Sequence, residues 1–484
     1  MTISGSLSNA LSGLAAASRA AEVVSSNVAN SLTEGYGRRQ LDLASRAVGG
    51  NGAGVLVQGV HRSVDEHVIA ERRLADAAFG EASVASEFFG QLELVFGLPD
   101  DAGSLTGRLA QFEATLLEAA SRPDSDARLN SVLTTAGAFS NFLNQASGQI
   151  QQLRLNADNE IDRQVGLLNN GLSKITELNQ QIRSQLAAGN DATALMDHRQ
   201  QFIDSVSGIV PLRQVPRQGG QIALFTTGGS IVLDSSASVV EFSAVGTIVP
   251  QMEIGSSTLS GLTINGLSVP LTENGPMSGG SLSGLFAIRD DHGVVAQKRL
   301  DAVARDLIER FADPAVDPSL GPADPGIFTD ASLPFNLANE IGLSGRIEIN
   351  SLLDPATGGA VWRLRDGLNA TTPGDVGNST LLQSLSTALR TPRVPASGGF
   401  IGAARSAIGL SSDLMSLTNI SLRSLDAESS FALAQVDILK NAELQNGVDT
   451  DYEMQQLLLI EQAYAANARV VATIDEMIHT ILGL

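Results

Sequence analysis

The stretch SNVANSLTEGYGRRQ, from Ser26 to Gln40, ends a run of small and apolar residues with Asn, Thr and two glycines. Upstream of it, apolar residues recur at alternating steps of four and three, which is the a/d spacing of a heptad helix. Gly35 permits the positive φ of a tight turn, and Tyr36 can anchor that turn by packing. We therefore expect a terminal helix that stops here so that the chain can turn into the next domain. Its seam residues are Ile3, Leu7, Leu14, Val24 and Val28.

The other end of the chain carries a second heptad seam. Thr450 and Glu453 have capping-box spacing, which predicts the start of this helix. Asn467 interrupts the apolar residues, and it either fixes the register of a helix pair or faces solvent on a slightly rotated seam. Each terminal segment would span roughly 40 Å as a helix, so we expect the two to pair. The seam residues are Leu457, Ile460, Tyr464, Val471, Ile474, Ile478 and Ile481.

The middle of the chain mixes helical and strand patterns. A helical period over 150–186 predicts a long central helix, with Gly166 and Gly171 off its apolar stripe and Gly189 as its C-terminal cap. Shorter helical patterns cover 296–311 and 408–444. Residues 211–280 alternate β-branched residues with Ser, Thr and Gly, which indicates an all-β insertion, and 346–367 is also strand-like.

These patterns predict an elongated α+β multi-domain protein with coiled-coil terminal helices, a helical middle domain and an inserted all-β domain. The expected domains are a terminal coiled coil (1–40 and 445–484), a helical middle domain (41–210, 281–313 and 376–444) and a β-rich outer domain (211–280 and 314–375).

Composition excludes several classes of function. The chain has 31 basic and 52 acidic residues, a net charge of −21, so nucleic acid and anionic membranes are poor partners. It has no cysteine, which removes disulfides, zinc-thiolate sites and thiol nucleophiles. Its N-terminal segment has neither the basic start nor the continuous apolar stretch of a cleavable signal peptide, and no apolar run is long enough to span a membrane.

No pattern indicates catalysis or metal binding. The five histidines have no paired-ligand spacing, and His61 and His67 would not share a helix face. The acidic loop 313–324 lacks the alternating ligands of a calcium loop, and the glycines of 49–54 fit a β-turn better than a phosphate loop. A hydrolase acting on cell-wall polymer would need paired carboxylates that we do not find. We therefore expect no enzyme activity, no catalytic residues, no metal and no cofactor.

The opening stretch resembles the N-terminal signature of bacterial flagellar axial proteins, in which a heptad helix ends in an Asn-Ile-Ala-Asn run and a Thr-x-Gly-Tyr turn. The chain departs from this signature at Ser26, where the family often has Asn, and at Glu34, where it often has Pro. The C-terminal segment resembles the closing helix of the same family. The matching residues are Asn27, Val28, Ala29, Asn30, Thr33, Gly35 and Tyr36 at the first end and Gln462, Ala463, Tyr464, Ala466, Ala468 and Asp475 at the second.

The middle segments resemble the hook-associated members of this family. Leu195, Asp197, Arg199 and Ser207 match a family motif, whereas Gln200 stands where the family has a second Asp. The resemblance implies a structural protein of the hook-filament junction that assembles as a ring, with its paired terminal helices in the inner tube wall. It also implies export through the flagellar type III channel without a cleavable signal, and an extracellular location. The implied partners are other copies of the chain, hook protein, the second junction protein and an export chaperone on the C-terminal helix.

The alternative within the family is a hook or distal rod component, because those proteins share the closing sequence AYAANARVVATIDEMI. In either case the terminal helices lack a core of their own, so we expect them to become ordered on assembly.

Overall fold

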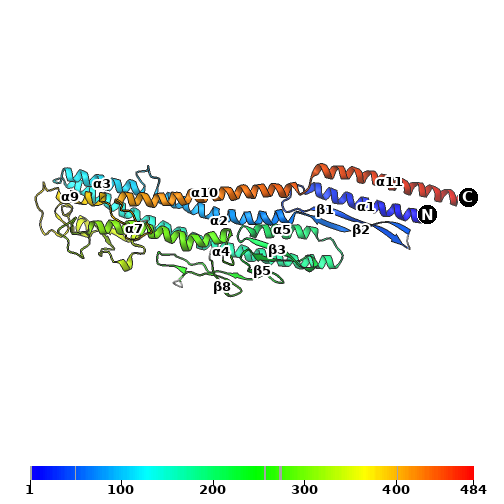
Figure 1. Cartoon of the computed structure of the whole chain (residues 1–484), viewed down its shortest axis with the longest axis horizontal. Helices are drawn as coiled ribbons and strands as arrows, with labels where there is room; N and C mark the ends of the chain where they lie inside the picture. Colours follow the sequence, from blue (N-terminus) through cyan, green and yellow to red (C-terminus); the bar gives the residue numbers. More distant parts are fainter. Residues whose placement is uncertain (1–2, 49–50, 255–257, 272–274, 401, 484) are drawn as a thin grey trace.

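The computed structural model describes residues 3–48, 51–254, 258–271, 275–400 and 402–483. The molecule is elongated, with both termini at the same end (Figure 1). Two parts follow one another along its length, and we call them the arm and the rod. The arm contains α1 (Ile3–Ala29), β1 (Arg38–Val48), β2 (Asn51–Ser63) and α11 (Thr450–Leu482), and the rod contains the elements between β2 and α11.

In the arm, α1 and α11 pack side by side, as the matched seams predict. The sequence did not lead us to expect β1 and β2, which form an antiparallel hairpin that lies along α1. The hairpin pairs Arg38 with Ser63 at its base and Ala47 with Gly52 near its tip. We had assigned 41–63 to the helical middle domain, whereas 41–48 and 51–63 form these strands. Of the predicted turn at 49–54, residues 49–50 lie outside the described residues, and 51–54 belong to β2.

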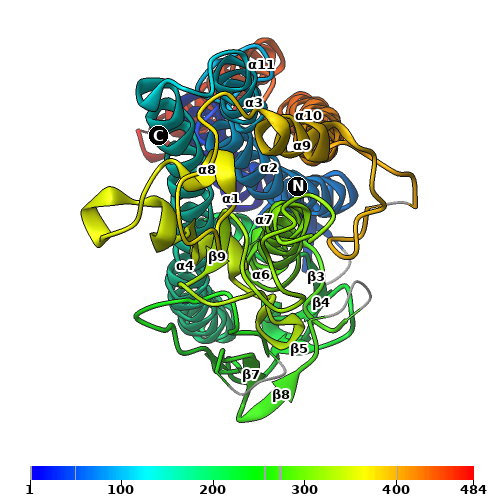
Figure 2. The same cartoon turned by 90° about the vertical axis from the view of Figure 1, so that its left-hand side faces the viewer.

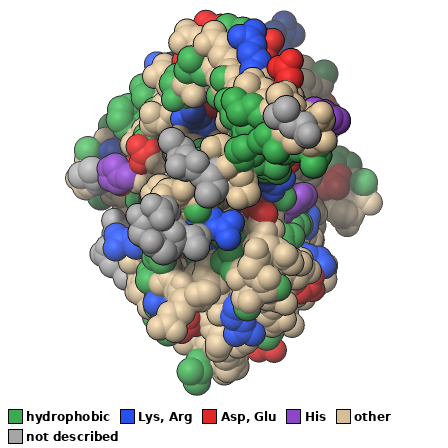
Figure 3. All heavy atoms as spheres, turned by 90° about the vertical axis from the view of Figure 1, so that its right-hand side faces the viewer, with side chains coloured by type: hydrophobic (Ala, Val, Ile, Leu, Met, Phe, Trp, Pro, Cys, Tyr) green, Lys and Arg blue, Asp and Glu red, His purple; other side chains and the backbone are tan. Residues whose placement is uncertain are grey.

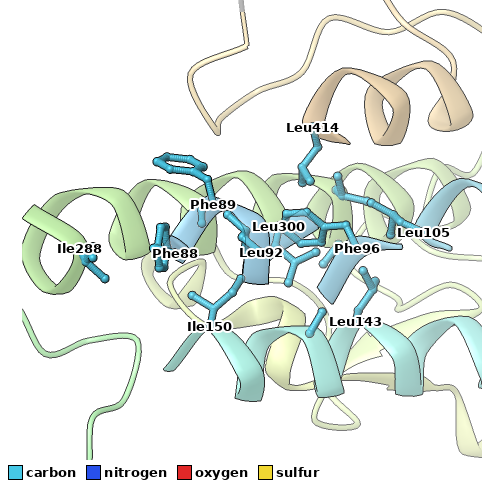
Figure 4. Close-up of a cluster of buried hydrophobic side chains, with 14 of the residues drawn as sticks. Phe88, Phe89, Leu92, Phe96, Leu105, Leu143, Ile150, Ile288, Leu300 and Leu414 are labelled. Carbon is cyan, nitrogen blue, oxygen red and sulfur yellow. The ribbon is translucent and has the colours of Figure 1, made fainter. Parts of the chain in front are cut away.

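The rod is a bundle of long helices around an apolar core. Figure 4 shows Phe88, Leu92 and Phe96 of α2 directed toward Ile150 of α4 and Leu300 of α7. Burial of this apolar stripe is what stabilises the bundle. The long helices are α2 (Glu66–Phe96), α3 (Leu105–Ser121), α4 (Asp126–Ala187), α7 (Gly293–Phe311) and α10 (Ala407–Gln445).

The central helix α4 begins at Asp126, well before the predicted start at Ile150, because its buried stripe already begins at Leu129. It ends as predicted: Gly189 has φ +76°, and its N–H donates to the Leu186 carbonyl. Gly171 is buried, so its predicted place off the stripe was wrong. A Cβ there would lie 2.5 Å from Val206 of α5, so the glycine lets α5 approach α4 closely.

The short helices connect and cover the bundle. A single turn of π-helix, η3, joins α6 to α7, and α9 packs on α3 and α7. The short elements are α5 (Thr193–Ser207), α6 (Gly280–Ala287), η3 (Ile288–His292), α8 (Arg363–Asp366) and α9 (Thr380–Arg390).

The strands of the rod form small antiparallel sheets on the side away from α10 (Figure 2). The sheets are β3 (Leu212–Pro216) with β4 (Ile222–Thr226) and β5 (Ile231–Leu233), then β6 (Val240–Glu241) with β7 (Leu262–Ile264) and β8 (Leu267–Val269), and finally β9 (Phe328–Asp330) with β10 (Ile347–Ile349). Within the described residues, the two segments that we grouped as one outer domain share no sheet. Most of 346–367 is short helical turns rather than strand.

Across the part of the chain that the structure describes, every helix is too short or too polar to cross a bilayer.

Candidate functional site: the joint between arm and rod

The end of α1 is held by the Asn27 side chain, which hydrogen-bonds the backbone of β1 as a neighbouring strand would. Asn27 is 1% exposed, and its Nδ2 donates to the Arg39 carbonyl at 2.9 Å. Its Oδ1 accepts from the Arg39 N–H at 2.9 Å and from the Tyr36 hydroxyl at 3.0 Å. The amide thereby satisfies both backbone groups of one residue of β1, so the chain is held where it doubles back.

The turn between α1 and β1 has the features that the family signature implies. Gly35 has φ +76°, which favours glycine. Asn30 donates through Nδ2 to the Ser26 carbonyl at 2.9 Å and accepts from the Thr33 hydroxyl at 3.3 Å. Gly37 makes room for Arg62, because a Cβ at this position would lie 2.2 Å from the side chain of that arginine.

Asp197 of α5 links the turn to the rod. It accepts from the Gly37 N–H at 2.9 Å, from Arg62 Nε at 2.6 Å and from Arg39 Nη2 at 3.3 Å. Asp197 and both arginines are mostly buried. One carboxylate of the rod therefore receives three donors from the arm, and charge-assisted hydrogen bonds of this kind are the strong ones.

Gln200, one turn after Asp197, connects the hairpin to α10. Its Oε1 accepts from Arg62, and its Nε2 donates to Glu443 at 2.9 Å. An aspartate at this position, as in the family motif, could not donate to Glu443 and would repel it. The departure that we noted at Gln200 is thus explained by its acidic neighbour.

Glu443 also belongs to a buried ion-pair network between α10, α2 and α5. Arg72 contacts Glu443 at 2.6 Å and Asp204 at 2.7 Å, and Arg73 contacts Asp204 at 2.6 Å. Burial alone would lower the pKa of Arg72, but Asp204, Glu443 and Asp76 more than offset it, so this pKa is raised. The network fixes the position at which α10 leaves the rod toward α11.

The start of α11 is fixed by a further pair. Arg38 Nε donates to Glu453 Oε1 at 2.7 Å, and Glu453 is 1% exposed. The capping box predicted at Thr450 and Glu453 is wrong, because Asp449 caps the helix by accepting from the N–H groups of residues 451 and 452. Glu453 is therefore free to hold Arg38, whose guanidinium also lies 4.7 Å from the centre of the Tyr452 ring.

The predicted seam residues differ in exposure. Val24 and Ile474 are buried, whereas Ile3, Tyr464 and Ile481 are 39%, 49% and 59% exposed. Figure 3 shows hydrophobic side chains gathered at this end of the molecule, over α1 and α11. The pair thus leaves much apolar surface uncovered in the single chain. The half-buried seam residues are Leu7, Leu14, Val28, Leu457, Ile460, Val471 and Ile478.

Asn467 lies on the side of α11 that faces α1. Its side chain is so close to Gly13 that a Cβ there would lie 2.7 Å from Asn467 Oδ1, and its Nδ2 donates to the Ala463 carbonyl of its own helix. This position fits the first of the two interpretations, in which a polar residue sets the register of the pair.

We expect Asn467→Val to stabilise the pairing of α1 with α11 by about 1 kcal/mol, because a half-buried amide is replaced by an apolar side chain of similar size. Amide exchange of α11 in the full chain measures this change. Unchanged or faster exchange would show that the Asn467 amide does not destabilise the pairing of α1 with α11.

Tyr36 contributes a hydroxyl that bonds Asn27 and lies 3.2 Å from the Ser26 hydroxyl. Burial raises its pKa above the ordinary value near 10. An acid whose pKa is raised on folding holds its proton more tightly in the folded state than in the unfolded state. The Tyr36 hydroxyl therefore contributes its full share of the free energy of unfolding below a pH of about 10, and this share is lost as the pH rises through the pKa of the folded state.

We therefore expect Tyr36→Phe to weaken the joint by about 1 kcal/mol at neutral pH. Because the variant has no hydroxyl to ionise, its free energy of unfolding should fall less than that of the wild type when the pH is raised above about 10. Urea unfolding at neutral pH and above pH 10 measures both effects, and equal alkaline loss in the two proteins would contradict the role of Tyr36.

The segments that we considered for metal binding are structural in the described residues. His61 lies on β2, with Nδ1 at 2.9 Å from Asp42, and His67 lies in the first turn of α2. In the acidic loop, Asp317 accepts from the Leu368 N–H at 3.0 Å and from Ser319. Over all described residues, no group of three potential ligands comes together.

Family comparisons cover most of the arm and the bundle. Residues 7–36 match a family model described as flagella basal body rod protein, and 445–484 match the C-terminal model of the flagellar basal body rod FlgEFG proteins. Residues 89–313 match the helical domain of flagellar hook-associated protein FlgK. The chain is thus similar to flagellar axial proteins over 7–36, 89–313 and 445–484. The joint therefore lies between α1 and α11, which match the two basal body rod models, and a rod whose residues 89–313 match the FlgK helical domain.

Individual relatives are similar over part of their length. Flagellar hook-associated protein 1 of Bacillus subtilis is 26% identical over 240 residues, which cover 47% of each chain. The protein of that name from Salmonella typhimurium is 28% identical over 245 residues, 48% of this chain and 43% of the relative. The matches thus span less than half of each relative. The flagellar hook junction protein FlgK from Burkholderia pseudomallei aligns in structure with a TM-score of 0.45 and 19% identity, over 54% of this chain and 46% of that one.

Sequence reasoning found Asn27, Tyr36 and Asp197 through the family resemblance. It missed Arg38, Arg39, Arg62, Arg72 and Glu443 as parts of the joint. A signal was available for Arg38 and Arg39, because these two arginines directly follow the turn in a chain with fewer basic than acidic residues.

Proposed function

We propose that this axial protein is a structural, non-enzymatic component of the first ring that joins hook to filament. The match of 89–313 to the helical domain of a hook-associated protein carries this proposal, because the two basal body rod models match only the terminal segments of this chain. The long rod would form the outer part of the ring, and the arm would line its inner wall.

The exposed apolar surface of α1 and α11 supports self-assembly. Leu11, Leu458 and Leu459 are all more than half exposed on the arm, and only Glu453 and Ile474 of α11 are buried. A helix pair with so few buried residues is marginal in water, and neighbouring copies would cover it. The predicted seam residues would thus stabilise the pair and the ring together.

The remaining parts of the proposal come from the family. The protein would leave the cell through the flagellar export channel, with a chaperone on its C-terminal helix, and would contact hook protein and the second junction protein outside the cell. The terminal, middle and β-rich segments would act as separate domains. A hook or distal rod role is less well supported, because it leaves the match of 89–313 without a reason.

Deletion of the gene tests the proposal. We expect electron microscopy to show complete hooks without filaments, with flagellin lost to the medium and filaments restored by the gene on a plasmid. Missing hooks would instead assign the protein to the rod or hook.

A further inference from the structure

A small cavity beside the joint is surrounded by arginines. It measures about 90 Å³ and lies between the end of β2, the first turns of α2, the helix α5 and the strand β3. This is room for a few water molecules or one small oxyanion. The polar residues that line it are Arg62, Glu66, Arg73, Arg199, Gln200 and Gln214.

Arg199 is the unusual member of this group. It is 7% exposed, and its hydrogen bonds to the described residues both use Nη1, which donates to Asn179 Oδ1 at 2.8 Å and to the Gly220 carbonyl at 2.7 Å. Both acceptors are neutral. Burial first, and then Arg62 and Arg73, lower the pKa of Arg199 to about 10. A buried cation with no carboxylate bonded to it normally has an anionic partner.

The nearby carboxylates are already engaged or remote. Asp197 receives three donors from the arm, and Asp204 is held by Arg72 and Arg73. Glu66 lines the cavity but is exposed, and its charge raises the pKa of Arg199 by less than burial, Arg62 and Arg73 lower it. The cavity thus keeps an electropositive wall in a chain whose net charge is −21.

We propose that this cavity binds a tetrahedral inorganic oxyanion, phosphate or sulfate, with Arg199 as its principal ligand. Arg199 offers Nε and Nη2, which have no hydrogen-bond partner within the described residues, and Arg62 and Arg73 line the same cavity. Planar guanidinium groups bind such oxygens through paired donors. The bound ion would connect β2, α2 and α5 at the base of the arm.

The test is titration of the full chain with inorganic phosphate in the low-millimolar range, at an ionic strength held constant with chloride, followed by calorimetry. We expect one saturable site per chain. Arg199→Gln should weaken binding by about tenfold or more, because charge-assisted bonds are lost. Glu66→Gln should tighten it by a few fold, since a repelling charge is removed at an exposed position.

Arg122→Gln is the matched control, because it removes one positive charge from an exposed position, 66% accessible, at the C-terminal end of α3. Its affinity should equal that of the wild type. No saturable binding, or equal affinities in the wild type, Arg199→Gln and Glu66→Gln, would overturn the proposal. If Arg199→Gln does not fold, the Glu66→Gln affinity decides alone, and an unchanged value overturns it.

Discussion

Replacement of Asp197 by Asn should abolish filament assembly while the rod remains folded. The substitution keeps the size of the side chain but leaves Arg39 and Arg62, which are mostly buried, without their shared carboxylate. Removal of one partner from a buried ion pair typically costs about 3–5 kcal/mol. Because Asp197 joins the arm to α5, this cost falls on the joint rather than on the apolar core around Phe88 and Leu92.

Amide exchange of the purified full chain measures the effect. Protection of the Gly37 N–H and of β1 should fall by about 10² to 10³, while α2 and α4 should exchange as before. Asp42→Asn is the matched control, because it removes the same charge from an exposed pair with His61 on the same hairpin and should change little. Equal exchange in the two variants would contradict the role of Asp197.

Ile474→Asp should have the second large effect, on the pairing of the terminal helices. Ile474 is 5% exposed and is the buried apolar residue of α11. A carboxylate placed there costs about 3 kcal/mol or more unless the helices separate. We expect loss of filaments in cells that carry the variant, while the purified protein melts at the wild-type temperature, because the arm adds little to the rod core.

Ala472→Asp separates pairing within the chain from contacts between chains. Ala472 is exposed on the side of α11 away from Ile474, so the same charge leaves the α1–α11 pair intact. The two variants should differ in amide exchange across α11. A lower melting temperature of the rod in Ile474→Asp would show that arm and rod fold as one unit, which would contradict the expected independence of the rod core.

The helices of this fold are readily predicted, because their signal is local. The seams of α1 and α11, the turn at Gly35 and the cap at Gly189 follow from spacing and backbone chemistry within a few residues. The hairpin β1–β2 was missed because its strands mix apolar residues with small and polar ones such as Ala44 and Gln40, and it packs along α1. The pairing of β1 with β2 and their contact with α1 stabilise these residues as strands.

The joint was predictable only in part for the same reason. Asn27 and Tyr36 act within a dozen residues of one another, and a family signature preserves that spacing. Asp197 bonds Arg62 from 135 positions away, and Glu453 bonds Arg38 across 415, so no local pattern pairs them. Glu453 was misassigned as a cap because its spacing from Thr450 fits one, whereas its partner is set by the packing of the arm.

The proposed ring between hook and filament requires α1 and α11 to be paired on its inner wall. Electron cryomicroscopy of isolated hook-filament junctions tests this requirement most directly. We predict a layer between hook and filament in which the rod lies outside and the paired helices line the channel. A layer without this chain, or one in which α1 and α11 are separated within each copy, would contradict the proposal.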